Sequence, residues 1–395
     1  MITRLMVIAG LVLTLVLPIY PTGVSLDIAA FFAFASLAAL FGLTHRAARR
    51  ELMVIAPWFL ALLVAMFVGS FHGTNPQQAF EDTLPYLLFV MGLLAGRGLS
   101  KPRQVLVVTL AVCVIDAMIS LWKIPQWGPG IRSTFTYWKI TAGLPLVGMF
   151  VSSLLRHTDP LGRRPSLRNR PLHAVLYLVM FVGMMATVSR GMMLGWLIAI
   201  TVTAYIRKPS QVLAGAIVIA LAFLVYSSVF EDFGTRYLRA GQAGTIGERF
   251  HEIETAWGTF VANPLFGAGL GDSFEIHGVH KSYVHNMAAY HLWKFGLLGS
   301  TMLILPLWLI STQLRANVRT VRAVAIGGAL GVIAYLVTCA AYKTYYLVWI
   351  YGVVAGATLS WLAAWRWRQQ PPRPPATTAT ATAAVTVQND PPRGA

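Results

Sequence analysis

Residues 231–260, EDFGTRYLRAGQAGTIGERFHEIETAWGTF, begin the one long polar interval of the chain, which continues to Gly299 and has long apolar runs on both sides. The interval holds seven of the fourteen acidic residues and five of the nine histidines. A protein built of apolar runs has no structural need for so long a polar loop. We therefore predict that the interval carries the active region.

The composition indicates a polytopic membrane protein. The 395 residues are 56% hydrophobic and 11% charged, with a mean hydropathy of +0.64, whereas about a quarter of the residues in soluble domains are charged. Many apolar runs are long enough to cross the ~30 Å of bilayer hydrocarbon. The backbone must be helical there, because lipid offers no hydrogen-bond partner. Both cysteines lie in apolar runs and imply no disulfide framework.

Hydropathy predicts an all-α fold with about twelve transmembrane helices. The predicted spans are about 5–20, 26–43, 52–70, 83–96, 104–122, 140–155, 172–188, 192–206, 211–229, 292–311, 323–341 and 346–364. We expect a transmembrane domain over residues 1–365 and a long, partly helical external loop over 230–291. The tail over 369–395 is rich in Pro, Ala and Thr and is expected to be disordered.

The basic residues indicate the orientation in the membrane. The net charge is +17, and Lys and Arg gather mostly in alternate short loops between apolar runs. The positive-inside rule then places both termini in the cytoplasm and the long polar loop on the outer side. Because the loops account for the charge, we predict no nucleic-acid partner.

Two polar features of the apolar part allow two interpretations each. Asp116 is the one acidic residue well inside a predicted span, since Asp27 lies at the first turn of the span 26–43. An acidic residue inside the membrane is functional by default, but Asp116 has no proton-relay partner evident in the sequence, so we interpret it as a structural polar contact.

The external loop Lys123–Lys139 combines several aromatic residues with Arg132. It is typical of an aromatic belt at the lipid–water boundary, with a sugar-stacking surface as the alternative.

Two arginines are candidates for binding phosphate. Arg190 lies in Thr187–Gly191, which joins two spans with almost no loop, so its guanidinium is held at the external edge of the hydrocarbon. An anionic partner explains this position better than snorkelling does. Arg249 begins a predicted helix whose N-terminal amides favour an anion. Arginine suits phosphate because its planar fork donates hydrogen bonds in pairs.

The predicted helix covers Arg249–Phe260 and is amphipathic. Its apolar residues at helical spacing are Phe250, Ile253, Trp257 and Phe260. We expect this face to pack on the spans or to lie in the membrane interface. Asn263–Gly271 follows, in which Pro264 ends the helix and three glycines make a tight turn, a signal too weak to indicate a nucleotide loop.

The end of the polar interval supplies a candidate general base. His285 is of the residue type best suited to remove a proton near neutral pH. Secondary candidates for the site are Asn286, Lys281, His251 and Arg132. His277 and His280 lie close to His285 in the sequence, but their spacing matches no metal motif, so we predict no metal.

Three motifs together resemble one known family. His285-Asn286, nine residues and then Gly296-Leu297-Leu298-Gly299 resemble the signature of bacterial O-antigen ligases. Asn263–Gly267, with the glycines that follow, is similar to the wider ligase and polymerase superfamily. Ser189-Arg190-Gly191 between two closely linked spans is likewise typical of it. The motifs lie between residues 187 and 299, and the likeness of span architecture covers about 1–365.

The resemblance implies an activity, a location and a set of roles. It implies a GT-C-like glycosyltransferase of the bacterial inner membrane, with its active site facing the periplasm. The enzyme would transfer O-antigen from undecaprenyl diphosphate to lipid A–core oligosaccharide, without nucleotide sugar, metal or other cofactor. His285 would be the general base, and Arg190 and Arg249 would bind the diphosphate.

Three other activities remain open. An O-antigen polymerase would perform the same chemistry on a second lipid-linked glycan. A protein O-oligosaccharyltransferase of the same superfamily usually carries a larger extramembrane portion after its last spans. A lipid-linked glycan transporter belongs to a different class, and we would expect it to show more charge inside the membrane.

Overall fold

The computed structural model describes residues 1–15, 17, 26–127, 143–157, 169–186, 190–210, 212, 243–276, 278–313, 319–338 and 344–369. Its helices are α1 (Ile2–Leu13), α2 (Leu26–Gly42), α3 (Arg46–Phe71), α4 (Pro76–Arg97), α5 (Pro102–Trp127), α6 (Gly143–His157), α7 (Asn169–Ala186), α8 (Arg190–Arg207), α11 (Ala243–Ala262), α12 (Met287–Thr312), α13 (Arg319–Thr338) and α14 (Tyr345–Gln369). A hairpin of β1 (Phe274–Ile276) and β2 (Val279–Lys281) lies between α11 and α12.

The helices confirm an all-α integral membrane protein. Within the described residues, six helices are long and apolar enough to cross a membrane, namely α3, α4, α5, α12, α13 and α14. Shorter apolar helices include α1 and α2 and parts of α7 and α8. A helix overlaps each predicted span except 211–229, most of which lies outside the described residues, as do Arg132 and the tail from residue 370. The number of twelve spans therefore stays a prediction.

Close glycine contacts bring α4 and α14 together at the centre of the bundle. Gly92 and Gly96 of α4 meet Gly352 and Gly356 of α14, and a Cβ at any of the four would collide with main-chain atoms of the opposite helix. The spacing of four residues places each glycine pair on one helix face. Small residues at this spacing let membrane helices pack backbone to backbone.

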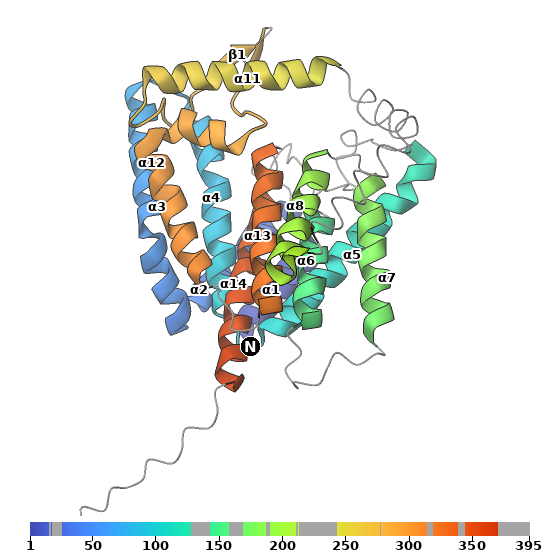
Figure 1. Cartoon of the computed structure of the whole chain (residues 1–395). Helices are drawn as coiled ribbons and strands as arrows, with labels where there is room; N and C mark the ends of the chain where they lie inside the picture. The colour runs from blue at the N-terminus through green and yellow to red at the C-terminus, as the bar shows by residue number, and fades with distance from the viewer. Residues whose placement is uncertain are drawn as a thin grey trace, which may run out of the picture.

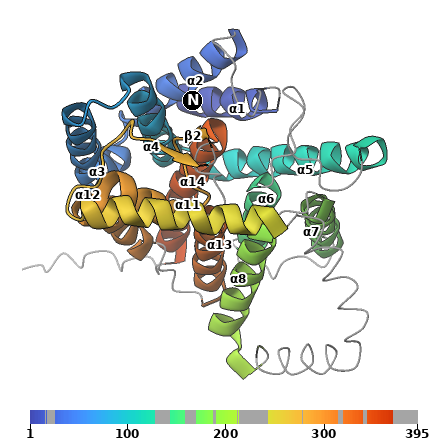
Figure 2. The ribbon, with the colours of Figure 1, turned by 90° about the horizontal axis from the view of Figure 1, so that it is seen from above.

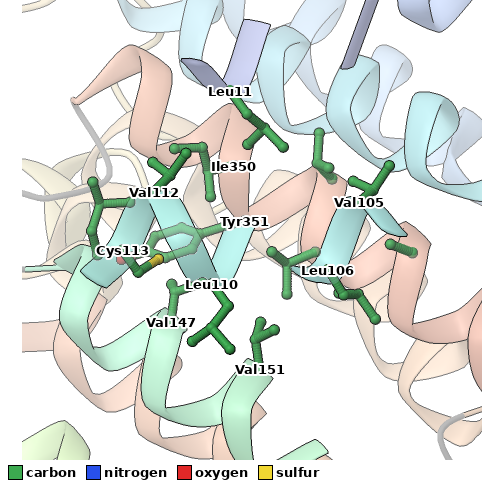
Figure 3. Packing of buried hydrophobic residues seen from close by; sticks show 14 of the residues in the cluster. Leu11, Val105, Leu106, Leu110, Val112, Cys113, Val147, Val151, Ile350 and Tyr351 are labelled. Atoms are coloured by element: carbon green, nitrogen blue, oxygen red, sulfur yellow. The ribbon is translucent and has the colours of Figure 1, made fainter. Parts of the chain in front are cut away.

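The main core lies around α14. Leu11 of α1, Val112 of α5, Val147 of α6 and Ile350 of α14 are buried in one cluster, and Figure 3 shows them meeting at the crossing of these helices. A second cluster joins α3, α4 and α12, where the indole nitrogen of Trp58 donates to the carbonyl of Leu303 at 2.6 Å. The second cluster forms the base on which α11 rests.

Helix α11 lies crosswise over one end of the bundle, away from the N-terminus (Figures 1 and 2). From Gly247 onward, where its side chains are described, the buried ones are Glu252, Ala256 and Phe260, whereas Phe250 and Trp257 are 69% and 53% exposed. Of the residues on the expected apolar face, Phe260 packs on the bundle, whereas Phe250 and Trp257 do not. The helix turns a different face inward because the carboxylate of Glu252 finds partners there.

Candidate functional site

Helix α12 is interrupted at Gly296, the first glycine of the motif Gly296-Leu297-Leu298-Gly299. Gly296 has φ +61° and ψ −167°, so two helical segments meet there, and Figure 1 shows the first segment bent beneath α11. The interruption releases main-chain carbonyls that a continuous helix would use. Trp293 O accepts from Ala268 N–H at 2.8 Å, and Lys294 O accepts from Gly269 N–H at 3.1 Å. The glycine-rich turn thus caps the first segment.

The same turn also caps the second segment. The N–H groups of Leu297 and Leu298 donate to the carbonyls of Pro264 and Leu265 at 2.9 and 3.0 Å. These amides begin a helix and have no partner within it. A Cβ at Gly296 would lie 2.5 Å from the Leu265 carbonyl, and the positive φ disfavours any other residue. The two sequence motifs are therefore one structural unit.

A buried ion pair fixes this unit to the bundle. Lys294 Nζ lies 2.9 Å from Asp82 Oδ2 of α4, and both side chains are fully buried. Lys294 also donates to the carbonyl of Asp272 and lies 4.2 Å from the centre of the Trp293 ring. Asp82 accepts from the N–H of Gly271 at 3.0 Å. These contacts satisfy the charges that burial would otherwise make costly.

Asn286 fixes the start of α12 beside the candidate base. Its side-chain oxygen accepts from the N–H of Ala289 at 3.0 Å, an N-cap contact. His285 therefore directly precedes a capped helix. Its main-chain position is set by α12, and its side chain turns toward α11.

Glu252 of α11 joins His285 and Lys281. One carboxylate oxygen accepts from Lys281 Nζ at 2.7 Å. The other lies 2.8 Å from His285 Nδ1 and accepts from the main-chain N–H of His285 at 3.1 Å. The Glu252 side chain is 1% exposed, whereas that of His285 is 30% exposed. The three residues come from α11, β2 and the entry to α12, and the carboxylate is where these segments meet.

The contacts keep the carboxylate ionised. Burial by itself would raise the pKa of Glu252, but the hydrogen bonds from His285 and Lys281 outweigh it and hold the pKa at about 2. Burial lowers the pKa of Lys281, yet the Glu252 carboxylate outweighs this effect and raises that pKa above its ordinary value. An ionised carboxylate can only accept hydrogen bonds. His285 Nδ1 must therefore carry a proton, which in the neutral ring leaves Nε2 free to take one.

Because α11 begins at Ala243, Arg249 does not stand at the helix N-terminus as expected; it lies within the helix, on the inward side and one turn before Glu252. Residues three apart share a helix face, and the Nε of Arg249 is buried without a hydrogen-bond partner among the described residues. A buried guanidinium nitrogen without a partner is costly. An anionic ligand would satisfy it.

The remaining predicted residues lie apart from this cluster or outside the described part. His251 is half exposed and lies 3.7 Å from Glu254 on the other side of α11. Arg190 is the first residue of α8. Gly191 beside it packs on Thr338 at the end of α13, the end that returns to the side of α11. Among the described residues, no group of three His, Cys, Asp or Glu side chains could hold a metal ion.

Three residues of the site were missed by sequence reasoning, namely Glu252, Asp82 and Lys294. Lys294 carried a usable signal, because it is the one Lys or Arg inside a predicted span, where it needs a counter-ion. Asp82 lies one residue before the predicted span 83–96, so hydropathy did not mark it as an intramembrane acid. Glu252 was one of several acids in a polar loop, and nothing local distinguished it.

Comparison with known proteins identifies the region that contains the cluster. Residues 175–304 match the family model described as O-antigen ligase. The matched range runs from α7 through α8, α11 and the hairpin into α12, and so includes Arg190, Arg249, Glu252 and His285. A comparison with curated proteins finds no match.

Proposed function

The chain belongs to the O-antigen ligase/polymerase superfamily through residues 175–304, and on this premise we propose that it is an O-antigen ligase. In this proposal it transfers O-antigen from undecaprenyl diphosphate to lipid A–core oligosaccharide at the periplasmic face of the inner membrane. The architecture would be of the GT-C type, with residues 230–291 forming the periplasmic loop. Neither metal nor other cofactor takes part.

The observation that carries the proposal is the setting of His285. Its ring is held at Nδ1 by a buried carboxylate and is exposed enough to be reached by a second substrate. In the proposed step, Nε2 takes the proton of an acceptor hydroxyl. The hydroxyl oxygen bonds to the anomeric carbon of the donor as the bond from that carbon to the diphosphate oxygen breaks. The leaving diphosphate takes the electron pair, and the proton stays on His285.

Cationic side chains would stabilise the leaving diphosphate. Arg249 has a buried nitrogen that an anion would satisfy, and it shares the inward side of α11 with Glu252. Lys281 adds a positive charge beside His285. Arg190 begins a helix whose end lies on the same side of the bundle. Fixed charges of this kind stabilise charge that develops in a transition state.

Ligation by purified protein tests the proposal. Protein in liposomes would be mixed with carrier-linked O-antigen and rough lipopolysaccharide, and the product followed as a ladder on a gel. We expect His285→Ala to abolish the ladder. His280→Ala is the matched control, because His280 is exposed on the neighbouring hairpin, and it should retain the ladder. An undiminished rate in His285→Ala would remove His285 from the role of base.

A second comparison tests the diphosphate site. Arg249→Lys keeps the charge but loses the paired donors, so activity should fall about 100-fold by analogy with other charge-stabilising groups. Arg103→Lys, at an exposed position in the first turn of α5 at the other end of the bundle, should leave activity unchanged. Full activity of Arg249→Lys would contradict a paired contact to phosphate.

The alternative within the superfamily is an O-antigen polymerase. It would extend carrier-linked repeats in the absence of rough lipopolysaccharide. Polymer formed under those conditions, without a ladder on the core, would favour the polymerase. A transporter would move lipid-linked glycan and form no new glycosidic bond in either mixture.

A further inference from the structure

We propose that Glu252 is the positioning residue for His285, fixing the tautomer and orientation of its ring and stabilising the charge that the ring acquires. The inference rests on the proposed function, since it assigns the partner of the proposed base. It also gives α11 a role, because the helix would bring this carboxylate to the start of α12 and so complete the site.

The geometry is that of an orienting contact. One oxygen of Glu252 is shared between the ring Nδ1 and the main-chain N–H of the same residue, at 2.8 and 3.1 Å. Two contacts from one oxygen to one residue fix the ring relative to its own backbone. The ring is thereby held with Nδ1 inward, so that Nε2 is left for the exposed side.

Burial distinguishes this contact from an incidental ion pair. The Glu252 side chain is 1% exposed, and a buried carboxylate is costly unless it is fully paired. One turn further along α11, the inward position is filled by Ala256, which is fully buried and meets the packing requirement without charge. Packing at this face of α11 therefore does not by itself require a carboxylate, and the carboxylate of Glu252 is instead directed at His285 and Lys281.

The charges around His285 fit a proton-accepting role. The charged groups that face His285 are Glu252 from α11 and Lys281 from β2, Glu248 one turn earlier in α11 acts on Lys281, and the Tyr283 ring lies edge-on at 5.5 Å. When His285 takes a proton, the positive ring lies against the Glu252 carboxylate. A carboxylate that orients a catalytic histidine acts in the same way in hydrolases, by holding the tautomer and stabilising the imidazolium. Lys281 holds the second carboxylate oxygen and so keeps the first one directed at the ring.

The test compares four purified proteins by kcat, KM and pH profile in the ligation assay. They are the wild type, Glu252→Gln, His285→Ala and the double variant. We expect Glu252→Gln to lower kcat about 100-fold or more, the range of a general base, with KM little changed. The acid limb of the pH–rate profile should move to lower pH, because a neutral amide no longer favours the protonated ring. The double variant should be no slower than His285→Ala alone.

Controls separate positioning from folding. Glu254→Gln changes an exposed glutamate on the same helix and should leave kcat unchanged. Glu252→Asp keeps the charge and should recover part of the rate and the wild-type acid limb, which restored folding alone would not do. A melting curve for each variant shows that the compared proteins are folded.

The outcomes distinguish the two proposals. If His285→Ala is inactive while Glu252→Gln retains wild-type kcat and pH profile, the positioning role of Glu252 is wrong. The proposal that His285 is the general base still stands in that case. Additive losses in the double variant would likewise overturn the positioning role. If His285→Ala is fully active, the proposed base fails, and the role of Glu252 fails with it.

Discussion

Replacing Lys294 by Met should strongly destabilise the protein, because it leaves a buried carboxylate without its counter-ion. Lys294 and Asp82 are both fully buried, 2.9 Å apart. Asp82 would retain hydrogen bonds from the Gly271 N–H and the Gln78 side chain but lose the charge of Lys294. Removing one partner of a buried pair costs about 3–5 kcal/mol of unfolding free energy. Methionine has nearly the volume of the lysine stem, so the electrostatic loss should dominate.

The double substitution Asp82→Leu with Lys294→Met should recover most of this loss. It leaves neither charge buried, and apolar replacement of a whole buried pair is often neutral. Asp82→Leu alone should be as harmful as Lys294→Met, because it isolates the lysine. The two single variants and the double variant form a cycle that measures the coupling between the side chains.

A thiol-reactive dye can follow the unfolding, because Cys113 is a free, fully buried cysteine. In a Cys339→Ser background, heating would expose Cys113 and give a midpoint for each variant. Lys101→Met, at an exposed position, is the control for removing one charge. A wild-type midpoint for Lys294→Met would refute the reasoning, as would a double variant that melts no higher than the single ones.

Three further predictions concern the same end of the bundle. Gly296→Ala should lower both the melting temperature and ligation, because a Cβ would meet the Leu265 carbonyl at 2.5 Å and φ is +61°. Asn286→Ala should cost about 1 kcal/mol by removing the N-cap of α12, which a melting curve would register and Asn286→Asp should largely prevent. The stabilising contribution of Glu252, whose pKa is lowered from 4.5 to about 2, should be complete above pH 4.5 and lost as the pH falls toward 2. Glu252→Gln should lack this loss when unfolding is measured across that range.

The sequence alone predicted a helical membrane protein and a candidate site in the polar interval. Hydropathy predicts helices because a span needs only its own apolar residues and internal hydrogen bonds. The polar interval was also visible, and it contains His285 and Lys281, which contact Glu252, and Arg249, which lies one turn before Glu252 in α11. A membrane helix and a polar interval can be recognised because each depends on residues that are near one another in the sequence.

Contacts between segments that are distant in the sequence could not be predicted from local patterns. The glycine pattern at Gly296 was visible, but not that Asn263–Gly271 fills the interruption it creates. Periodicity placed Phe250 and Trp257 on an apolar face that would pack on the spans or lie in the membrane interface; they do not pack on the bundle, and a buried carboxylate occupies the inward side. A pattern of apolar residues cannot show that a glutamate will find Lys281 and His285 as partners from outside its own helix.

The interruption at Gly296 also limits how much of α12 can cross a bilayer as one straight helix. The segment after it, Leu297–Thr312, has sixteen residues, roughly 24 Å at 1.5 Å per residue, against ~30 Å of hydrocarbon. A span shorter than the hydrocarbon is accommodated by local thinning of the bilayer or by flanking side chains that reach the interface. Hydrophobic mismatch along α12 would therefore draw the headgroup layer toward the glycine-rich turn, which in the proposed function is the side from which the lipid-linked donor reaches the site.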